Sequence, residues 1–184
     1  MPGIALWFTG LSGSGKTSLC HALEPQLRAL GHRVCVLDAD ELRSTVNRDL
    51  GFSKAERDEN VARLAILASD SVQRGWVVLV AAISPYRAAR ARARSIVGSF
   101  LEIYVDAPLE VCIRRDPKGL YARALGGQLR HFTGIDDPYE APVSPDLHVN
   151  TDVDSLSACT AMVLTAVGKA MRSVHAGRTD TALQ

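Results

Sequence analysis

The feature that most restricts the possible folds of this chain is a glycine-rich octapeptide that ends in lysine and threonine. Residues Gly10–Thr17 read GLSGSGKT, which fits the pattern GxxxxGK[ST]. The apolar segment Ile4–Thr9 precedes it, and leucines at helical spacing follow it. Glycines let the backbone curl so that successive N–H groups face phosphate oxygens beside a helix N-terminus. The pattern therefore predicts a strand, a phosphate-binding loop and a helix in direct succession.

This loop predicts the binding of a purine nucleoside triphosphate. We expect Lys16 to reach the β- and γ-phosphates and the Thr17 hydroxyl to ligate Mg²⁺. The residues predicted to hold the triphosphate are Gly10, Leu11, Ser12, Gly13, Ser14, Gly15, Lys16 and Thr17.

Short apolar segments alternate with longer amphipathic ones along the chain. The segments predicted as buried strands are Ile4–Thr9, Arg33–Asp38, Val77–Ile83, Phe100–Val105 and Leu147–Asn150. Helical spacing predicts one helix ending at Gly31, another ending before Gly75, and a last one over Ser155–Met171. This alternation predicts an α/β fold of the P-loop NTPase type, a three-layer sandwich with a five-stranded parallel sheet and helices on both faces. Ligands of such sheets bind beyond the carboxyl ends of the strands, where we expect Gly10, Asp38, Ser84 and Asp106.

The composition is that of one globular domain. The chain has 184 residues and a formal charge of +1, so the total charge favours neither a nucleic-acid nor a membrane surface. The four cysteines form no CxxC pair, which argues against a disulfide scaffold and a zinc site. We see neither a signal-peptide pattern nor a long apolar run, and we expect a cytoplasmic protein. Residues 1–172 are expected to form the domain and residues 173–184 a polar, frayed tail.

Residues 116–145, which we call the lid segment, interrupt the alternation. They contain four prolines and four glycines and show no sustained periodicity. A connection of this length is more often a functional lid than a passive loop, although an ordered surface loop without a role is the alternative.

The second predicted strand ends in Asp38-Ala-Asp40, which contains two carboxylates. Asp38 and Asp40 are expected to face the triphosphate, where one can help to hold magnesium and the other can accept a proton from an attacking hydroxyl. Asp40 and Arg43 lie three residues apart, so a helix that begins there would carry both on one face. The alternative is that Asp40 is only a helix N-cap and Arg43 its solvated neighbour.

Seven blocks in this order resemble the adenylylsulfate (APS) kinase family across nearly the whole chain. They are Gly10–Thr17, Asp38–Arg43, Asn47–Ser53, Arg57–Asn60, Ser84–Arg87, Asp116–Tyr121 and Phe132–Glu140. The resemblance implies that ATP, with Mg²⁺, phosphorylates the 3′-hydroxyl of adenosine 5′-phosphosulfate (APS) to give 3′-phosphoadenosine 5′-phosphosulfate (PAPS) and ADP in sulfate assimilation.

The resemblance also implies roles for single residues. Asp40 would be the general base, in a catalytic set of Asp40, Lys16 and Ser84, and Arg115 would join the loop in binding ATP. The implied metal ligands are Thr17 and Asp38. The implied APS-binding residues, with Phe52 and Phe132 stacking on the adenine, are Asp38, Arg43, Phe52, Arg57, Asn60, Ile83, Ser84, Lys118 and Phe132.

Ser84 invites a second mechanism, because the family is commonly described with a phosphoserine intermediate at this position. No histidine stands near it in the sequence, and a serine needs a base to become a nucleophile. We therefore predict direct in-line transfer, with Ser84 at the substrate rim. In the same region Arg87 is a candidate for neutralising phosphate charge, whereas Arg90, Arg92 and Arg94 are expected to form a solvated helix face.

Two other functions remain open at this point. A P-loop kinase for another small-molecule hydroxyl would lack the set Arg43, Arg57 and Phe132, which is present. A non-catalytic PAPS-binding domain would have a degraded phosphate loop, whereas Lys16 and Thr17 are intact. The expected partners are ATP and APS, with no nucleic acid and no membrane, and a homodimer is possible.

Overall fold

The computed structural model describes residues 3–179, with side chains up to residue 172, and contains one parallel sheet. Five strands lie in the order β2-β3-β1-β4-β5. They are β1 (Ile4–Thr9), β2 (Val34–Asp38), β3 (Val77–Ala81), β4 (Phe100–Asp106) and β5 (Leu147–Asn150). The predicted α/β class, strand number and parallel pairing are confirmed.

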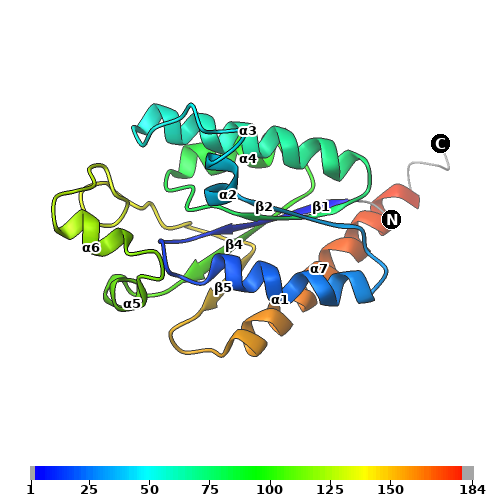
Figure 1. Cartoon of the computed structure of the whole chain (residues 1–184). Coiled ribbons are helices and arrows are strands. Elements are labelled where there is room, and N and C mark those ends of the chain that lie inside the picture. The colour runs from blue at the N-terminus through cyan, green and yellow to red at the C-terminus, as the bar shows by residue number, and fades with distance from the viewer. Residues whose placement is uncertain (1–2, 180–184) are drawn as a thin grey trace.

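Helices cover both faces of this sheet (Figure 1). The helices are α1 (Lys16–Ala29), α2 (Ala39–Arg43), α3 (Lys54–Gln73), α4 (Arg87–Val97), α5 (Leu109–Arg115), α6 (Leu120–Leu125) and α7 (Leu156–Thr179). Helices α1 and α7 pack on one face, and α3 and α4 pack on the other. The result is the predicted three-layer sandwich.

The residues of the central strand β1 explain why helices pack on both faces of the sheet. All six of its residues are buried. Leu6 and Phe8 belong to the core beneath α1 and α7, whereas Ala5 and Trp7 belong to the core beneath α3 and α4. Because side chains alternate between the faces of a strand, a continuous apolar run is the pattern of a strand that is covered twice.

One predicted boundary is wrong. The last helix was expected to end at Met171, but α7 continues through Thr179; residues 180–184 of the predicted tail lie outside the described residues. The polar composition of residues 173–179 therefore did not mark the end of the helix. Within the described part of the chain, no helix is long and apolar enough to cross a membrane.

The lid segment lies at the carboxyl edge of the sheet, on the side away from the two termini (Figure 1). It contains one short helix, α6, which the sequence did not predict. Buried residues Tyr121, Ala124 and Phe132 join Val111 and Cys112 of α5 in a small separate core. The lid segment is therefore folded and has apolar packing of its own.

Candidate active site

The glycine-rich loop connects β1 to α1 as predicted, and two glycines explain its path. Gly15 caps α1 with a φ of 100°, a left-handed conformation that a residue with a Cβ adopts only under strain. A Cβ on Gly10 would lie 2.3 Å from the carbonyl oxygen of Val105 on β4, which is closer than any real contact. The loop therefore depends on glycine both for its turn and for its approach to the neighbouring strand.

Lys16, the first residue of α1, is folded back into the loop. Its Nζ atom donates to the carbonyl oxygens of Gly10 (2.9 Å) and Leu11 (2.7 Å). Burial lowers the pKa of Lys16 to about 8, although the carboxylates of Asp40 and Asp38 favour its charged form. The side chain thus presents a poorly solvated positive charge beside the cavity that phosphates would occupy.

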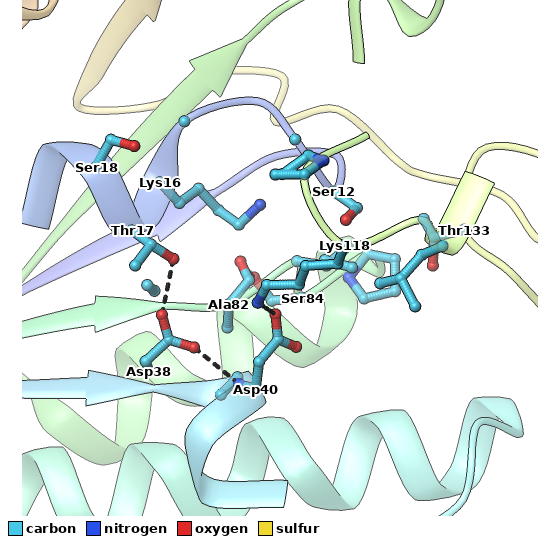
Figure 2. A pocket seen from close by; sticks show the side chains of 18 of the residues that line it. Ser12, Lys16, Thr17, Ser18, Asp38, Asp40, Ala82, Ser84, Lys118 and Thr133 are labelled. Carbon is cyan, nitrogen blue, oxygen red and sulfur yellow. Dashed lines mark hydrogen bonds and ion pairs between the residues drawn. The ribbon is translucent and has the colours of Figure 1, made fainter. Parts of the chain in front are cut away.

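The carboxylate of Asp38 is fixed from two sides, as Figure 2 shows. The Thr17 hydroxyl donates to its Oδ2 atom (2.7 Å), and the backbone N–H of Asp40 donates to its Oδ1 atom (2.9 Å). Asp38 is therefore the N-cap of α2. The alternative that made Asp40 the N-cap is wrong, and the side chain of Asp40 is left for another role.

Asp40 faces the lid segment rather than the helix backbone. Its Oδ2 atom accepts a hydrogen bond from Nζ of Lys118 at 2.6 Å (Figure 2). Partial burial lowers the pKa of Lys118, but the hydrogen bond and charge of Asp40 outweigh that effect and raise it overall. The lysine therefore stays protonated, and the pair connects the region after β2 to the lid segment.

A cavity of about 630 Å³ joins the loop to the lid segment. This volume is ordinary for a site that holds small molecules. The predicted site residues that line it are Ser12, Gly13, Gly15, Lys16, Thr17, Asp38, Asp40, Arg43, Phe52, Arg57, Asn60, Ile83, Ser84, Arg115, Lys118 and Phe132. Three predicted residues, Gly10, Leu11 and Ser14, are not part of the lining. They belong to the loop but do not border the cavity, and Ser14 is fully buried.

Phe52 lines this cavity close to two guanidinium groups. The guanidinium carbons of Arg43 and Arg57 lie 4.5 Å and 5.6 Å from its ring centre. The ring is 50% exposed, so the alternative of a core phenylalanine does not hold. An exposed aromatic face flanked by cations is suited to a flat, anionic ligand.

Arg57 connects the two aromatic walls of the cavity. Its Nε atom donates to the carbonyl oxygen of Phe52 (2.9 Å), and its Nη2 atom donates to the carbonyl oxygen of His131, directly before Phe132. Burial lowers the pKa of Arg57, an effect that the carboxylate of Asp137 opposes. The guanidinium was expected to hold the substrate, but these two bonds use part of it to position the walls.

Phe132 also lines the cavity and is only 9% exposed. Its ring meets the edge of Tyr121 with ring centres 5.0 Å apart and planes at 87°. The carboxylate of Asp136 accepts hydrogen bonds from the backbone N–H groups of His131 (2.7 Å) and Phe132 (2.5 Å). The lid segment thus holds this ring in place through its own fold.

Ser84 follows β3 and lines the cavity, and its hydroxyl already makes two hydrogen bonds. Its Oγ atom accepts from Nε1 of Trp7 (3.0 Å) and donates to the carbonyl oxygen of Ala82 (3.3 Å). The residue is 3% exposed and has a φ of 41°, which is rare for a residue other than glycine. Neither of these partners, an indole N–H and a backbone carbonyl oxygen, can act as a base toward this hydroxyl.

Two expectations for the arginines after Ser84 are wrong. Arg87 does not line the cavity, and its Nε atom donates to the carbonyl oxygen of Ala141. Arg90 was expected on a solvated face but is 2% exposed and paired with Glu102. The sequence pattern alone, an arginine every few residues, indicated an exposed helix face. The partners that bury Arg90, such as Glu102 and Glu140, lie elsewhere in the sequence.

Thr151 is a cavity residue that sequence reasoning missed. Its hydroxyl donates to the carbonyl oxygen of Ser14 (2.7 Å) and accepts from Nη1 of Arg115 (3.0 Å). Arg115 also donates to the carbonyl oxygen of Thr151 (2.7 Å). The signal was available, because Thr151 directly follows the last predicted strand and so lies on the same rim as Asp38.

The donor set at the loop suits a magnesium ion. Among residues 3–172, no group of three or more His, Cys, Asp or Glu side chains could hold a metal. Magnesium in phosphoryl-transfer sites needs only one or two protein ligands, since phosphates and waters supply the others. The Thr17 hydroxyl and the Asp38 carboxylate, 2.7 Å apart, fit that requirement.

Comparison with known proteins gives a consistent answer. The family model described as adenylylsulphate kinase matches residues 2–150. An adenylyl-sulfate kinase of Synechococcus sp. is 52% identical over 88% of this chain and 92% of its own. A probable adenylyl-sulfate kinase of Pseudomonas aeruginosa is 47% identical over 98% of this chain and 82% of its own.

A solved structure agrees with these relatives. The APS kinase of Mycobacterium tuberculosis, in complex with AMPPNP and APS, superposes with a TM-score of 0.87 and 46% identity. The match covers 91% of this chain and 98% of that one. With its phosphate loop, its cavity and these matches over most of its length, the chain belongs to the adenylylsulphate kinase family.

Proposed function

We propose that this protein transfers the γ-phosphate of ATP to the 3′-hydroxyl of APS, giving PAPS and ADP. The observation that carries the proposal is that residues of the phosphate loop, Asp40, Phe52 and Phe132 all line one cavity. Membership of the family and a relative bound to an ATP analogue and APS support the choice of substrates.

The triphosphate would occupy the loop beside Lys16. Its phosphates would replace the carbonyl oxygens of Gly10 and Leu11 as partners of the lysine, and main-chain N–H groups would face the remaining oxygens. Thr17 and Asp38 would hold Mg²⁺, which would offset the negative charge of the triphosphate. Arg115, at the cavity mouth with Thr151, would contact the nucleotide.

APS would lie across the cavity from the triphosphate. Its adenine would stack between Phe52 and Phe132, an interaction worth about 1–3 kcal/mol per base. Asn60 and the guanidinium N–H groups of Arg43 and Arg57 that remain available would face the phosphosulfate and ribose. Lys118, Ile83 and Ser84 would complete the wall on the reacting side.

The reaction would be a direct displacement at the γ-phosphorus. The 3′ oxygen of APS forms a bond to phosphorus as the bond to the β–γ bridging oxygen breaks, and ADP leaves. Asp40 accepts the proton of the 3′-hydroxyl, since of the two carboxylates at the end of β2, Asp38 and Asp40, only Asp38 caps a helix. The hydroxyl of Ser84 is buried and already makes two hydrogen bonds, which favours direct transfer over a phosphoserine intermediate.

A coupled assay of ADP release tests the substrate assignment. APS should support turnover, whereas adenosine, AMP and gluconate should not at the same concentration. Turnover with gluconate or AMP but not with APS would contradict the proposal. Product analysis for a 3′-phosphate on APS would identify the acceptor hydroxyl.

Asp40→Asn tests the base. The variant should lose about 10²–10⁴-fold in kcat, with the Kd for APS within about threefold of wild type. A loss confined to APS binding would remove Asp40 from the role of base.

The cytoplasmic location and the homodimer expected from the sequence belong to this proposal as well. Sedimentation of the purified protein tests whether it is a homodimer.

A further inference from the structure

Arg90 is a buried cation that lies outside the cavity and that the proposed reaction does not use. Its guanidinium donates through Nε to Glu102 on β4, through Nη1 to the carbonyl oxygen of Ser84, and through Nη2 to that of Glu140, each at 2.7 Å. A buried charge is tolerated only where it is paired and hydrogen-bonded. Here the planar fork of arginine satisfies that need by joining three segments that are distant in sequence.

Further hydrogen bonds connect two of those segments around Arg90. The backbone N–H of Glu140 donates to the carbonyl oxygen of Pro85 (2.8 Å), and the Glu140 carboxylate accepts from the backbone N–H of Arg87 (2.8 Å). Nε of Arg87 donates to the carbonyl oxygen of Ala141 (2.8 Å). The turn of residues 83–87 and residues 139–141, which end the lid segment, are thus held as one unit with Arg90 at its buried centre.

This unit supports the wall of the cavity on the APS side. Ile83, Ser84 and Pro85 line the cavity, and residues 139–141 follow the stretch that carries Phe132. Ser84 has a φ of 41°. A left-handed serine persists only where its surroundings over-determine it. Nη1 of Arg90 holds its carbonyl group while Nε1 of Trp7 holds its hydroxyl.

We propose that Arg90 is a positioning residue that fixes the turn 83–87 against the end of the lid segment and thereby sets the wall on which APS is oriented. The inference rests on the proposed function, because it assigns to Arg90 an effect on the binding and orientation of APS and not on the binding of ATP. Thr9 connects the unit to the end of β1, but residues Gly10–Thr17 of the phosphate loop take no part in the hydrogen bonds described above, so ATP binding should depend on the unit far less than APS binding does.

Arg90→Lys tests the proposal, because lysine retains the charge and loses the fork. We expect kcat/KM for APS to fall at least about tenfold, with the KM for ATP within about twofold of wild type. Arg92→Lys is the matched control, since Arg92 is exposed on the same helix, and it should match wild type. Equal losses for ATP and APS, or a variant indistinguishable from Arg92→Lys, would overturn the proposal.

A second variant covers the case in which Arg90→Lys does not fold. Arg87→Met removes the bond to Ala141 from an exposed position and should lower kcat/KM for APS about two- to fivefold without changing the KM for ATP. An unchanged kcat/KM for APS in Arg87→Met would count against the unit. A wild-type protein that does not turn over APS would instead contradict the proposed function, so the two failures are distinguishable.

Discussion

Nζ of Lys118 lies 2.6 Å from Oδ2 of Asp40, so a charged residue of the lid segment contacts the carboxylate proposed as the base. Both side chains are about half exposed, at 51% and 55%. Exposed ion pairs contribute about 0–1 kcal/mol to stability, so this contact matters for the site rather than for the fold. It holds a cation against the carboxylate that, in the proposed reaction, accepts the proton of the hydroxyl.

A double-mutant cycle measures this relationship. Lys118→Gln should lower kcat about tenfold in the wild-type background and at most about twofold in Asp40→Asn, because the lysine acts on kcat through Asp40. Steady-state kinetics at saturating ATP give the four values. Arg123→Gln, an exposed residue of α6, is the control and should leave kcat unchanged. The same loss of kcat in both backgrounds would mean that Lys118 acts independently of Asp40.

The lowered pKa of Lys16 predicts a basic limb in the pH profile. The free enzyme should lose kcat/KM for ATP above about pH 8, where Lys16 gives up its proton. Bound phosphates favour the charged lysine, so kcat itself should decline only at higher pH. Lys118, whose pKa is raised, stays charged across this range. A kcat/KM for ATP that stays flat to pH 10 would contradict this assignment.

The same shift has a consequence for stability. Because the folded-state pKa of Lys16 lies below its ordinary value of 10.5, the unfolded chain binds more protons between about pH 8 and that value. Stability therefore rises with pH in this window relative to a variant without the lysine. Denaturant unfolding of wild type and Lys16→Met at pH 7 and pH 10 checks the sign.

The rim of the sheet could be predicted from the sequence because strand ends leave a local pattern. Asp38 and Ser84 directly follow apolar runs, and a parallel sheet brings the carboxyl ends of its strands to one edge. Thr151 follows the same rule after β5, although only its contacts with Ser14 and Arg115 single it out.

Contacts between remote segments could not be predicted in this way. Arg90 stands among alternating arginines and alanines, and nothing local distinguishes it from the exposed Arg92. Its burial depends on Glu102 and on the carbonyl oxygens of Ser84 and Glu140, which only the folded chain brings together. The double role of Arg57 is hidden for the same reason, since its partner His131 lies 74 residues away.

Phe52 and Phe132, which both line the cavity, should differ in their contributions to APS binding and to stability. Phe52→Leu and Phe132→Leu should each raise the KM for APS about five- to fiftyfold, since stacking on a base is worth about 1–3 kcal/mol. Phe52 is half exposed and Phe132 is packed on Tyr121, so only Phe132→Leu should also lower the melting temperature. Steady-state kinetics and thermal unfolding separate the two effects. A Phe52→Leu variant with an unchanged KM for APS would remove that ring from the substrate site.

Ser84→Ala decides between direct transfer and a phosphoserine. The variant loses the hydroxyl that accepts from Trp7 and donates to Ala82, so we expect a modest destabilisation and a kcat within about tenfold of wild type. Ser95→Ala, an exposed serine of α4, is the control for a lost hydroxyl. During turnover with γ-labelled ATP, the wild-type protein should carry no label on Ser84. Label that appears and decays at the rate of catalysis, together with loss of turnover in Ser84→Ala, would establish the covalent path, because a hydroxyl that only fixes a turn cannot be kinetically competent.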